Sequence, residues 1–347
     1  MTSSGSYGGV KASEDGGASD VRVVRISNLP INSRAVHWVW FWLCCMIRIP
    51  FQGFDRCVVL TDPPFLPLVA FFLRSLGGLG RRFYWWTMDL YPEALAGAEM
   101  LKAGSRAYRV LHWLNTISIR QLSGVVALGN CQVKRMQKYP TWNTQEDFCV
   151  VVPPWDFREI SRISRRQNPV IQRFGWEQRK VVLYAGNLGQ GHLYEELLEA
   201  ARRLHEQGDE EWLFAFFCHG NRREALEQAA ADLPNLTVRD YLPPEDTSAL
   251  LNAASVHAIT MRPGWEGVIV PSKLYGVLQT PAPVLFVGPE NADTAAEIRR
   301  YHKGECLPVG CSAEDICAAL TKLAKGRREV EIDRTGPATI AEFVMRN

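Results

Sequence analysis

The stretch from Lys180 to His205 constrains the fold of this chain more than any other part of the sequence. An apolar run over residues 181–185 is followed by three glycines, Gly186, Gly189 and Gly191, and then by apolar residues at helical spacing. This order predicts a buried parallel strand, a glycine-rich turn and an amphipathic helix, which together make a βα unit. Backbone N–H groups of such a turn can bind a phosphate, because glycines allow left-handed backbone and close approach of a ligand. A tight turn that binds nothing is equally compatible with this stretch alone.

The composition limits the class of protein. A chain of 347 residues with 47% hydrophobic side chains is long enough for two domains with cores of their own. The 39 Lys and Arg nearly balance the 37 Asp and Glu, so the chain lacks the basic excess typical of nucleic-acid binders. None of the nine cysteines belongs to a Cys-x-x-Cys pair, which disfavours a zinc site and a disulfide framework and fits a reducing cytosol.

Alternating strand and helix patterns predict an α/β protein with parallel, doubly wound sheets. We expect two Rossmann-like domains that face each other across a cleft. The expected boundaries are a flexible segment over 1–20, an N-terminal domain over 21–155, a polar linker over 156–179, a C-terminal domain over 180–330 and a tail over 331–347. The expected strands are 21–26, 58–61, 83–88, 124–128, 150–152, 181–185, 212–217, 236–238, 256–260 and 283–288.

Residues 35–49 form one of the most apolar runs of the chain and contain Trp38, Trp40 and Trp42. The run is too short to span a bilayer as a helix. We interpret it as a buried helix of the first domain. The alternative is an amphipathic helix that lies on a membrane surface with its tryptophans exposed.

Asp89 directly follows the strand expected over residues 83–88. Acidic side chains at the carboxyl ends of strands in an α/β sheet point into the crevice where ligands bind. Asp89 is therefore a candidate site residue by its position. The alternative is that Asp89 caps the segment that follows.

A second set of polar residues lies between an expected strand and helix, over residues 261–276. Arg262 and Lys273 supply positive charge, Ser272 a hydroxyl at an expected helix start, and Glu266 a carboxylate. Such a set can hold a diphosphate and leave one acid free to orient a sugar. Taken singly, a solvated pair of cations and an ordinary helix cap explain the same residues.

Taken together with Tyr184-Ala185-Gly186-Asn187-Leu188-Gly189, these motifs resemble the GT-B glycosyltransferases of family 4. The resemblance is closest to the bacterial branch that builds cell-wall, capsule and exopolysaccharide precursors. It also rests on Pro-Ser-Lys-Leu at 271–274, Pro-Val-Leu at 283–285, Asp-Leu-Tyr-Pro-Glu at 89–93 and Val-Ala-Leu-Gly at 126–129. The resemblance covers roughly residues 20–325.

The resemblance implies a hexosyltransferase-type enzyme that transfers a sugar with retention at the anomeric carbon. The C-terminal domain would hold a nucleotide-diphosphate sugar as substrate, the N-terminal domain would hold the acceptor, and neither a cofactor nor a protein-bound metal would be needed. Glu266 would match the first acid of the family's Glu-x7-Glu signature, near the transferred sugar, and be catalytic with Asp89. The residues implied to bind phosphate or donor are Gly186, Asn187, Gly189, Arg262, Ser272 and Lys273.

Two departures from the family pattern qualify this expectation. Leu274 stands where the second acid of the signature, which binds the nucleotide's ribose in relatives, is expected. The strand, glycine loop, helix and second strand that normally precede the equivalent of residues 21–26 have no counterpart, although Met1-Thr2-Ser3 resembles the end of that second strand. We therefore expect an N-terminal domain that lacks its first βαβ unit.

The sequence thus favours a cytoplasmic sugar transferase that acts on a lipid-linked or polysaccharide acceptor, with a peripheral contact to the inner membrane face and no nucleic-acid partner. One alternative is a truncated or non-catalytic module, or a partner subunit, that only binds sugar nucleotides. A second alternative is a GT-B-like epimerase, which needs paired acids and histidines. His192 and His219 lie near the expected site loops without an evident acid partner in the sequence.

Overall fold

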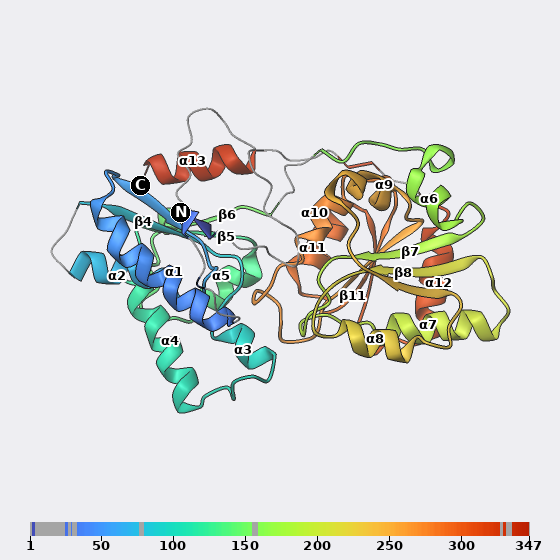
Figure 1. Ribbon diagram of the computed structural model, residues 1–347, viewed down its shortest axis with the longest axis horizontal. Helices are drawn as coiled ribbons and strands as arrows, with labels where there is room; N and C mark the ends of the chain where they lie inside the picture. The colour runs from blue at the N-terminus through green and yellow to red at the C-terminus, as the bar shows by residue number, and fades with distance from the viewer. Residues whose placement is uncertain are drawn as a thin grey trace.

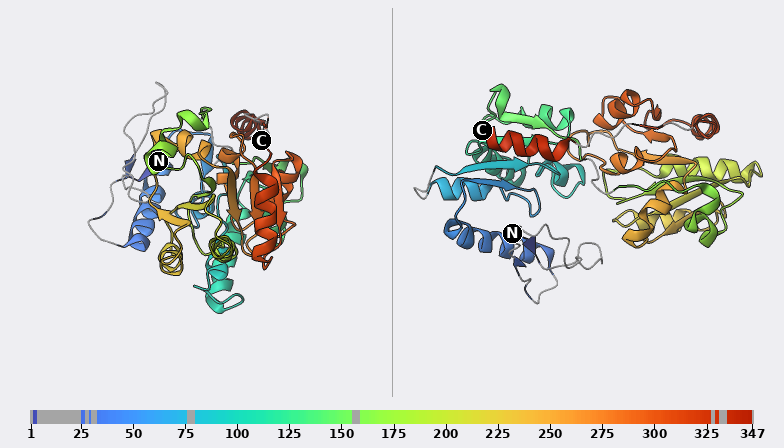
Figure 2. Two further views of the ribbon diagram at one scale, coloured as in Figure 1. Left: turned by 90° about the vertical axis from the view of Figure 1, so that its right-hand side faces the viewer. Right: turned by 90° about the horizontal axis from the view of Figure 1, so that it is seen from above.

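The computed structural model describes residues 2–3, 25–26, 29, 33–75, 80–154, 159–326, 329–330 and 335–346. Two α/β domains, each built on a parallel sheet, lie side by side (Figure 1). A view from above shows the same separation (Figure 2). Within the described residues, no helix is long and apolar enough to cross a membrane.

The N-terminal domain is built on a four-stranded parallel sheet with the order β3-β4-β5-β6. Its core lies where α1, α2 and α4 pack on this sheet around Val69, Phe83 and Val125. The strands are β3 (Arg56–Val59), β4 (Arg82–Trp86), β5 (Gly124–Ala127) and β6 (Cys149–Val151). The helices are α1 (Arg34–Arg48), α2 (Leu68–Ser75), α3 (Glu93–Gly97), α4 (Arg106–Ile119) and α5 (Asn130–Met136).

Two short strands, β1 (Thr2–Ser3) and β2 (Arg25–Ile26), pair in parallel in a sheet of their own. The expected strand over residues 21–26 is thus seen at its last two residues, and residues 21–24 lie outside the described part. The expected flexible segment over residues 1–20 is described only at Thr2 and Ser3, which are extended.

The C-terminal domain is built on a six-stranded parallel sheet with the order β12-β11-β10-β7-β8-β9. Within this domain, the chain forms β7 first and adds β8 and β9 on one side of it. It then returns and adds β10, β11 and β12 on the other side. Apolar clusters cover both faces of this sheet, as expected for near-continuous apolar strands. The strands are β7 (Lys180–Ala185), β8 (Trp212–Phe217), β9 (Leu236–Arg239), β10 (Val256–Thr260), β11 (Val284–Val287) and β12 (Gly304–Leu307). The helices are α7 (Glu195–Glu206), α8 (Arg223–Ala229), α9 (Thr247–Asn252), α10 (Lys273–Val277), α11 (Asp293–Arg300) and α12 (Ala313–Leu323).

The segment expected as a polar linker, 156–179, contains a helix that packs into the C-terminal domain. Helix α6 (Pro169–Phe174) starts at Asn168, whose side-chain oxygen accepts N–H bonds, and ends at Gly175 in left-handed backbone. Val170, Ile171 and Trp176 are buried in the core beside β7 and β8. The many charged residues of this stretch hide an apolar stripe, so composition alone indicates a linker where the structure has a packed helix.

The segment expected as a tail, 331–347, ends in a helix on the other domain. Helix α13 (Gly336–Arg346), drawn in red, lies over the N-terminal domain in both views (Figures 1 and 2). The Phe343 ring meets the buried Tyr84 ring of β4 edge to face, with centroids 5.9 Å apart. The C-terminal end of the chain therefore belongs to the fold of the N-terminal domain.

Helix α1, expected as a buried helix of the first domain, is buried on one face only. Phe41 and Cys45 lie in the core of the N-terminal domain, where α1 packs on α2, whereas Val39 and Ile47 are 60% and 66% exposed. The run is apolar on both faces, and only one face finds a partner among the described residues.

Candidate functional site

The candidate site lies at the carboxyl ends of β7 and β10, where the strand order of the sheet reverses. In open α/β sheets, ligands bind in the crevice outside this point. The turn after β7 and the loop after β10 are joined by an Arg262 N–H bond to the Gly191 carbonyl, 2.9 Å long. The Leu193 N–H also donates to Thr260 Oγ1 at 3.0 Å. The two stretches that the sequence singles out are thus brought together.

Lys273 holds a buried positive charge in this crevice. Its Nζ has no hydrogen-bond partner among the residues that the structure describes, and it lies 3.6 Å from the centroid of the Tyr184 ring. Gly186 has a φ of +142°, and a Cβ there would lie 3.5 Å from Nζ, so the lysine and the glycine turn face each other directly. Burial lowers the pKa of Lys273 to about 7. An ammonium without a partner in a buried position is suited to an anionic ligand.

The other predicted donor residues lie on the turn after β7 and on the stretch between β10 and α10. Ser272 precedes α10 and is exposed, and its side chain makes no capping hydrogen bond, which removes the alternative of an ordinary cap. Asn187 is exposed at the tip of the turn beside Gly189. The half-buried Arg262 guanidinium has no hydrogen bond or ion pair among the described residues. Hydroxyl, amide and guanidinium groups near one buried ammonium can together bind a diphosphate.

Arg222 is a residue of this region that no sequence motif indicates. Its guanidinium forms an ion pair with Glu195, donates to the His192 carbonyl, and lies 4.7 Å from the centroid of the Tyr194 ring. It reaches the site because β8, which precedes it, pairs with β7. Arg222 anchors the chain after the glycine turn to the first turn of α7.

The two histidines near the site are not paired with buried acids, as proton transfer in an epimerase would require. His192 is buried, and its Nδ1 lies 2.7 Å from the Thr260 carbonyl oxygen. Burial, helped by the charge of Lys273, lowers the pKa of His192 to about 3, so the ring is neutral near pH 7. His219 Nδ1 lies 3.9 Å from Asp240, whose side chain is 74% exposed and binds Arg223. Neither histidine supports the epimerase alternative.

Asp89 lies beyond the carboxyl end of β4, in the N-terminal domain. Burial and then the charge of Asp62, which follows the neighbouring strand β3, raise its pKa. Pro92, and not Asp89, occupies the N-cap position of α3, so the capping alternative does not hold. The structure places Asp89 at the sheet edge that meets the C-terminal domain, because the N–H of the next residue, Leu90, donates to the Val268 carbonyl.

Glu266 lies in the loop that makes this contact between the domains. Its carboxylate is 3.8 Å from the guanidinium of Arg135 on α5. The loop therefore places Glu266 on the C-terminal side of the contact and Asp89 on the N-terminal side. Leu274, at the position expected for the second acid, is buried in the core, so no side chain at this position reaches the site.

Known proteins that are similar to this chain are glycosyltransferases. No family model matches the chain. It is 25% identical over 279 residues to the probable glycosyltransferase WbjE of Pseudomonas aeruginosa, covering 80% of this chain and 66% of that protein. A stretch of 104 residues is 31% identical to the putative colanic acid biosynthesis glycosyl transferase WcaI of Escherichia coli K12, covering 29% of this chain and 25% of that protein. The chain thus spans just under two thirds of the first relative and a quarter of the second.

Solved structures resemble both domains. WaaG, a glycosyltransferase involved in lipopolysaccharide biosynthesis, matches with a TM-score of 0.60 at 16% identity, covering 93% of this chain and 81% of that chain. The chain has the GT-B glycosyltransferase fold. HepE from Anabaena, solved in complex with UDP-glucose, matches with a TM-score of 0.58 at 16% identity, covering 93% of this chain and 86% of that chain. The predicted fold class of two Rossmann-like domains is confirmed.

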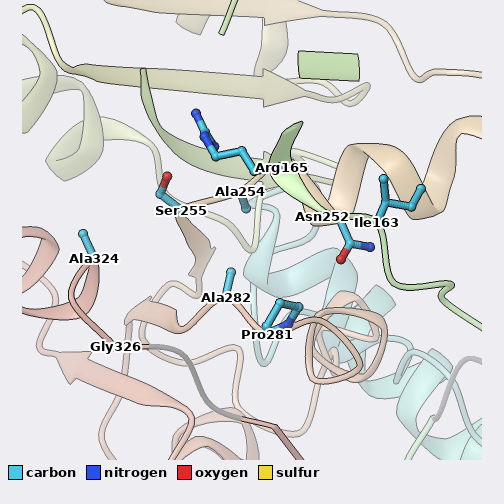
Figure 3. Close-up of a pocket in the computed structure, with 9 residues that line it drawn as sticks. All are labelled: Ile163, Arg165, Asn252, Ala254, Ser255, Pro281, Ala282, Ala324 and Gly326. Atoms are coloured by element: carbon cyan, nitrogen blue, oxygen red, sulfur yellow. The ribbon is translucent and has the colours of Figure 1, made fainter. Parts of the chain in front are cut away.

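A separate cavity of the GT-B chain lies away from the crevice. Its volume is about 60 Å³. Figure 3 shows the residues that line it. Ser255 directly precedes β10, and Pro281 and Ala282 precede β11, so the cavity lies at the amino ends of these strands. Its lining residues are Ile163, Arg165, Asn252, Ala254, Ser255, Pro281, Ala282, Ala324 and Gly326. This end of the sheet is opposite to the crevice that holds Lys273.

Proposed function

We propose that the chain is a glycosyltransferase that transfers a sugar from a nucleotide-diphosphate sugar to a lipid-linked or polysaccharide acceptor. The observation that carries the proposal is the buried, unpartnered ammonium of Lys273 facing the Gly186 turn. A donor diphosphate would supply the partner that this charge lacks. The names of the relatives, which refer to glycosyl transfer in polysaccharide and lipopolysaccharide synthesis, support the same class of substrates.

The leaving group of such a reaction is a nucleoside diphosphate, so the main task is to stabilise its developing negative charge. Lys273 and Arg262 supply fixed charge, and Ser272 and the N–H groups of the turn at 186–189 supply hydrogen bonds. Glu266 would contact the transferred sugar. Asp89, whose pKa is raised by burial, would position the acceptor hydroxyl and accept its proton.

Retention at the anomeric carbon, the hexosyl type and membership of family 4 are parts of this proposal that rest on the motif resemblance. The Pro-Ser-Lys-Leu motif is part of that resemblance, and its Lys273 lies at the first turn of α10, beside the glycine turn. The buried Leu274 leaves the ribose without the carboxylate that the signature provides. We therefore propose that the nucleotide base and ribose are held by groups other than a second signature acid.

The acceptor side of the proposal places the N-terminal domain at the cytoplasmic face of a membrane. Residues 100–145 contain seven Lys and Arg and no Asp or Glu. Within this stretch, Met100, Val110 and Trp113 are 77%, 56% and 56% exposed. Exposed apolar side chains among cations suit an interface with anionic lipid headgroups.

The proposal is tested by thermal unfolding of the chain with a panel of UDP, GDP, UDP-glucose and GDP-mannose. A ligand that binds the folded state raises the unfolding midpoint as its concentration exceeds Kd. We expect one nucleotide family to raise the midpoint. We expect Lys273→Met to abolish this rise without lowering the midpoint of the free chain, because it removes a buried charge that has no partner. Lys134→Met, at an exposed position of α5, is the matched control.

Two results decide between the alternatives. A cooperatively unfolding chain that responds to none of these nucleotides would overturn the donor site. A chain that binds a sugar nucleotide but never turns it over in the presence of a cell lipid extract would instead be the non-catalytic binding module.

A further inference from the structure

The loop that carries Glu266 is held from the other domain. Arg135, on α5 of the N-terminal domain, donates from Nε to the Glu266 carbonyl and from a terminal nitrogen to the Gly264 carbonyl. The same guanidinium lies 3.8 Å from the Glu266 carboxylate. One side chain thus binds the loop at two backbone positions and at the acid itself.

Trp265, the residue between these two carbonyls, links the donor turn to the acceptor domain. Its buried indole packs on Gly191, where a Cβ would lie 2.8 Å from the ring. The other edge of the indole packs on Gly97 of α3, where a Cβ would lie 2.9 Å away. Larger side chains at either glycine would displace the ring, so these contacts fix the position of the indole.

The backbone of the loop continues this contact. Gly267 has a φ of +72°, and a Cβ there would lie 2.3 Å from the carbonyl oxygen of Cys131 at the start of α5. The Val268 carbonyl accepts the N–H of Leu90 at 3.0 Å. Residues 264–268 therefore follow the surface of the N-terminal domain closely.

We propose that Arg135 is a positioning residue that sets Glu266 for transfer and makes this step depend on the acceptor domain. The inference rests on the proposed function. The guanidinium suits the task, because its planar fork binds two carbonyls at once in a fixed geometry. Donor binding itself uses Lys273 and the Gly186 turn, which belong to the C-terminal domain. Loss of Arg135 should therefore impair transfer and leave donor binding intact.

The test compares Arg135→Gln and Arg135→Lys with the wild-type chain, and uses Arg120→Gln, at an exposed position of the same domain, as control. The affinity for UDP-glucose or GDP-mannose, whichever the wild-type chain binds, is measured by calorimetry. Turnover is measured as release of the nucleoside diphosphate with a cell lipid extract as acceptor. We expect Arg135→Gln to keep its donor Kd within about twofold and to lose at least about tenfold in kcat, since small misplacements of a reacting group cost this much or more.

The conservative variant separates positioning from charge alone. Arg135→Lys keeps the charge but not the fork, so we expect its kcat to lie between those of wild type and Arg135→Gln, and Arg120→Gln to match wild type. An unchanged kcat in Arg135→Gln, or a donor Kd that rises as kcat falls, would overturn the inference. If Arg135→Gln fails to fold, Arg135→Lys takes its place in the test. A lower kcat at unchanged donor Kd would then support the inference, and an unchanged kcat would overturn it. A wild-type chain that binds neither sugar nucleotide would instead overturn the proposed function.

Discussion

The buried ammonium of Lys273 is the central feature of the proposed donor site. The residue starts α10, and its side chain runs to the carboxyl end of β7, where the Tyr184 ring and the Gly186 turn enclose the ammonium. The ring offers a cation–π contact, but among the described residues no hydrogen-bond acceptor replaces the water that the ammonium loses. The cost of burying this charge is the reason why its pKa falls from 10.5 to about 7.

The lowered pKa predicts a pH dependence of donor binding. Between about pH 7 and 10.5 the folded free chain holds fewer protons at Lys273 than the unfolded chain, so this residue makes the free chain more stable as the pH rises through that window. A bound diphosphate favours the charged form and raises the pKa again. Donor binding should therefore take up a proton above pH 7, and the donor Kd should rise by up to about tenfold per pH unit.

Calorimetry at pH 6.5, 7.5 and 8.5 checks this prediction. A nucleotide sugar is the suitable ligand, because neither phosphate of its diphosphate titrates in this range. Lys134→Met should keep the pH dependence of the wild-type chain. A donor Kd that stays constant from pH 6.5 to 8.5 would mean that Lys273 does not meet the diphosphate.

Helix α4 is the element that we propose to meet a membrane surface. Figure 1 shows α4 at the lower edge of the N-terminal domain, away from α13 at its upper edge. Tyr108, His112 and Trp113 of this helix line a groove of about 410 Å³ together with Arg109. The exposed Trp113 has both the apolar ring and the neighbouring cations that an interfacial contact needs.

Trp113→Glu should weaken binding to vesicles that contain anionic lipid, because it replaces an apolar ring by a charge that the headgroups repel. Cosedimentation with phosphatidylglycerol-containing vesicles measures the effect, and binding by the wild-type chain should fall with rising salt. Met345→Glu, at an exposed position of α13, is the matched control. Equal cosedimentation of all three chains would show that α4 does not contact the membrane. If a glycan protects the fluorescence of Trp113 from quenching, the groove would instead bind a polysaccharide acceptor.

The elements that could be predicted from sequence are those with a clear period. The strands at β7, β8 and β10 are uninterrupted apolar runs, and the expected ranges agree with the structure within a residue or two. The helices α6 and α13 were not predicted. α6 is short and lies among charged residues, and the ring of Phe343 on α13 packs on Tyr84, about 260 positions away in the chain. Such long-range packing leaves no local signal.

The part of the site that lies in local motifs could be predicted from the sequence, whereas the contacts that depend on the fold could not. The Gly186 turn and Lys273 form local motifs, and the parallel pairing of β7 with β10 brings them together. Arg222 and Arg135 have no motif, because their contacts depend on the order of strands and on the meeting of two domains. The roles of the predicted site residues remain predictions until ligand binding is measured.

At the scale of the whole molecule, the carboxyl ends of both sheets meet. Leu90 after β4 and Val268 after β10 share a hydrogen bond, and the Cys131 N–H at the start of α5 donates to the Asp293 carboxylate at 2.9 Å. The Glu266 loop lies within this contact. A donor held at the switch between β7 and β10 therefore lies on the side of its domain that faces the acceptor domain.

Hydrogen exchange with and without UDP-glucose or GDP-mannose tests the location of the donor most directly. We expect the bound sugar nucleotide to slow amide exchange in two segments, 186–191 and 271–277, which meet only in the folded chain. The protection should disappear in Lys273→Met. Protection confined to the cavity at the opposite end of the sheet, at residues 252–255 and 281–282, would place the donor away from Lys273 and the glycine turn.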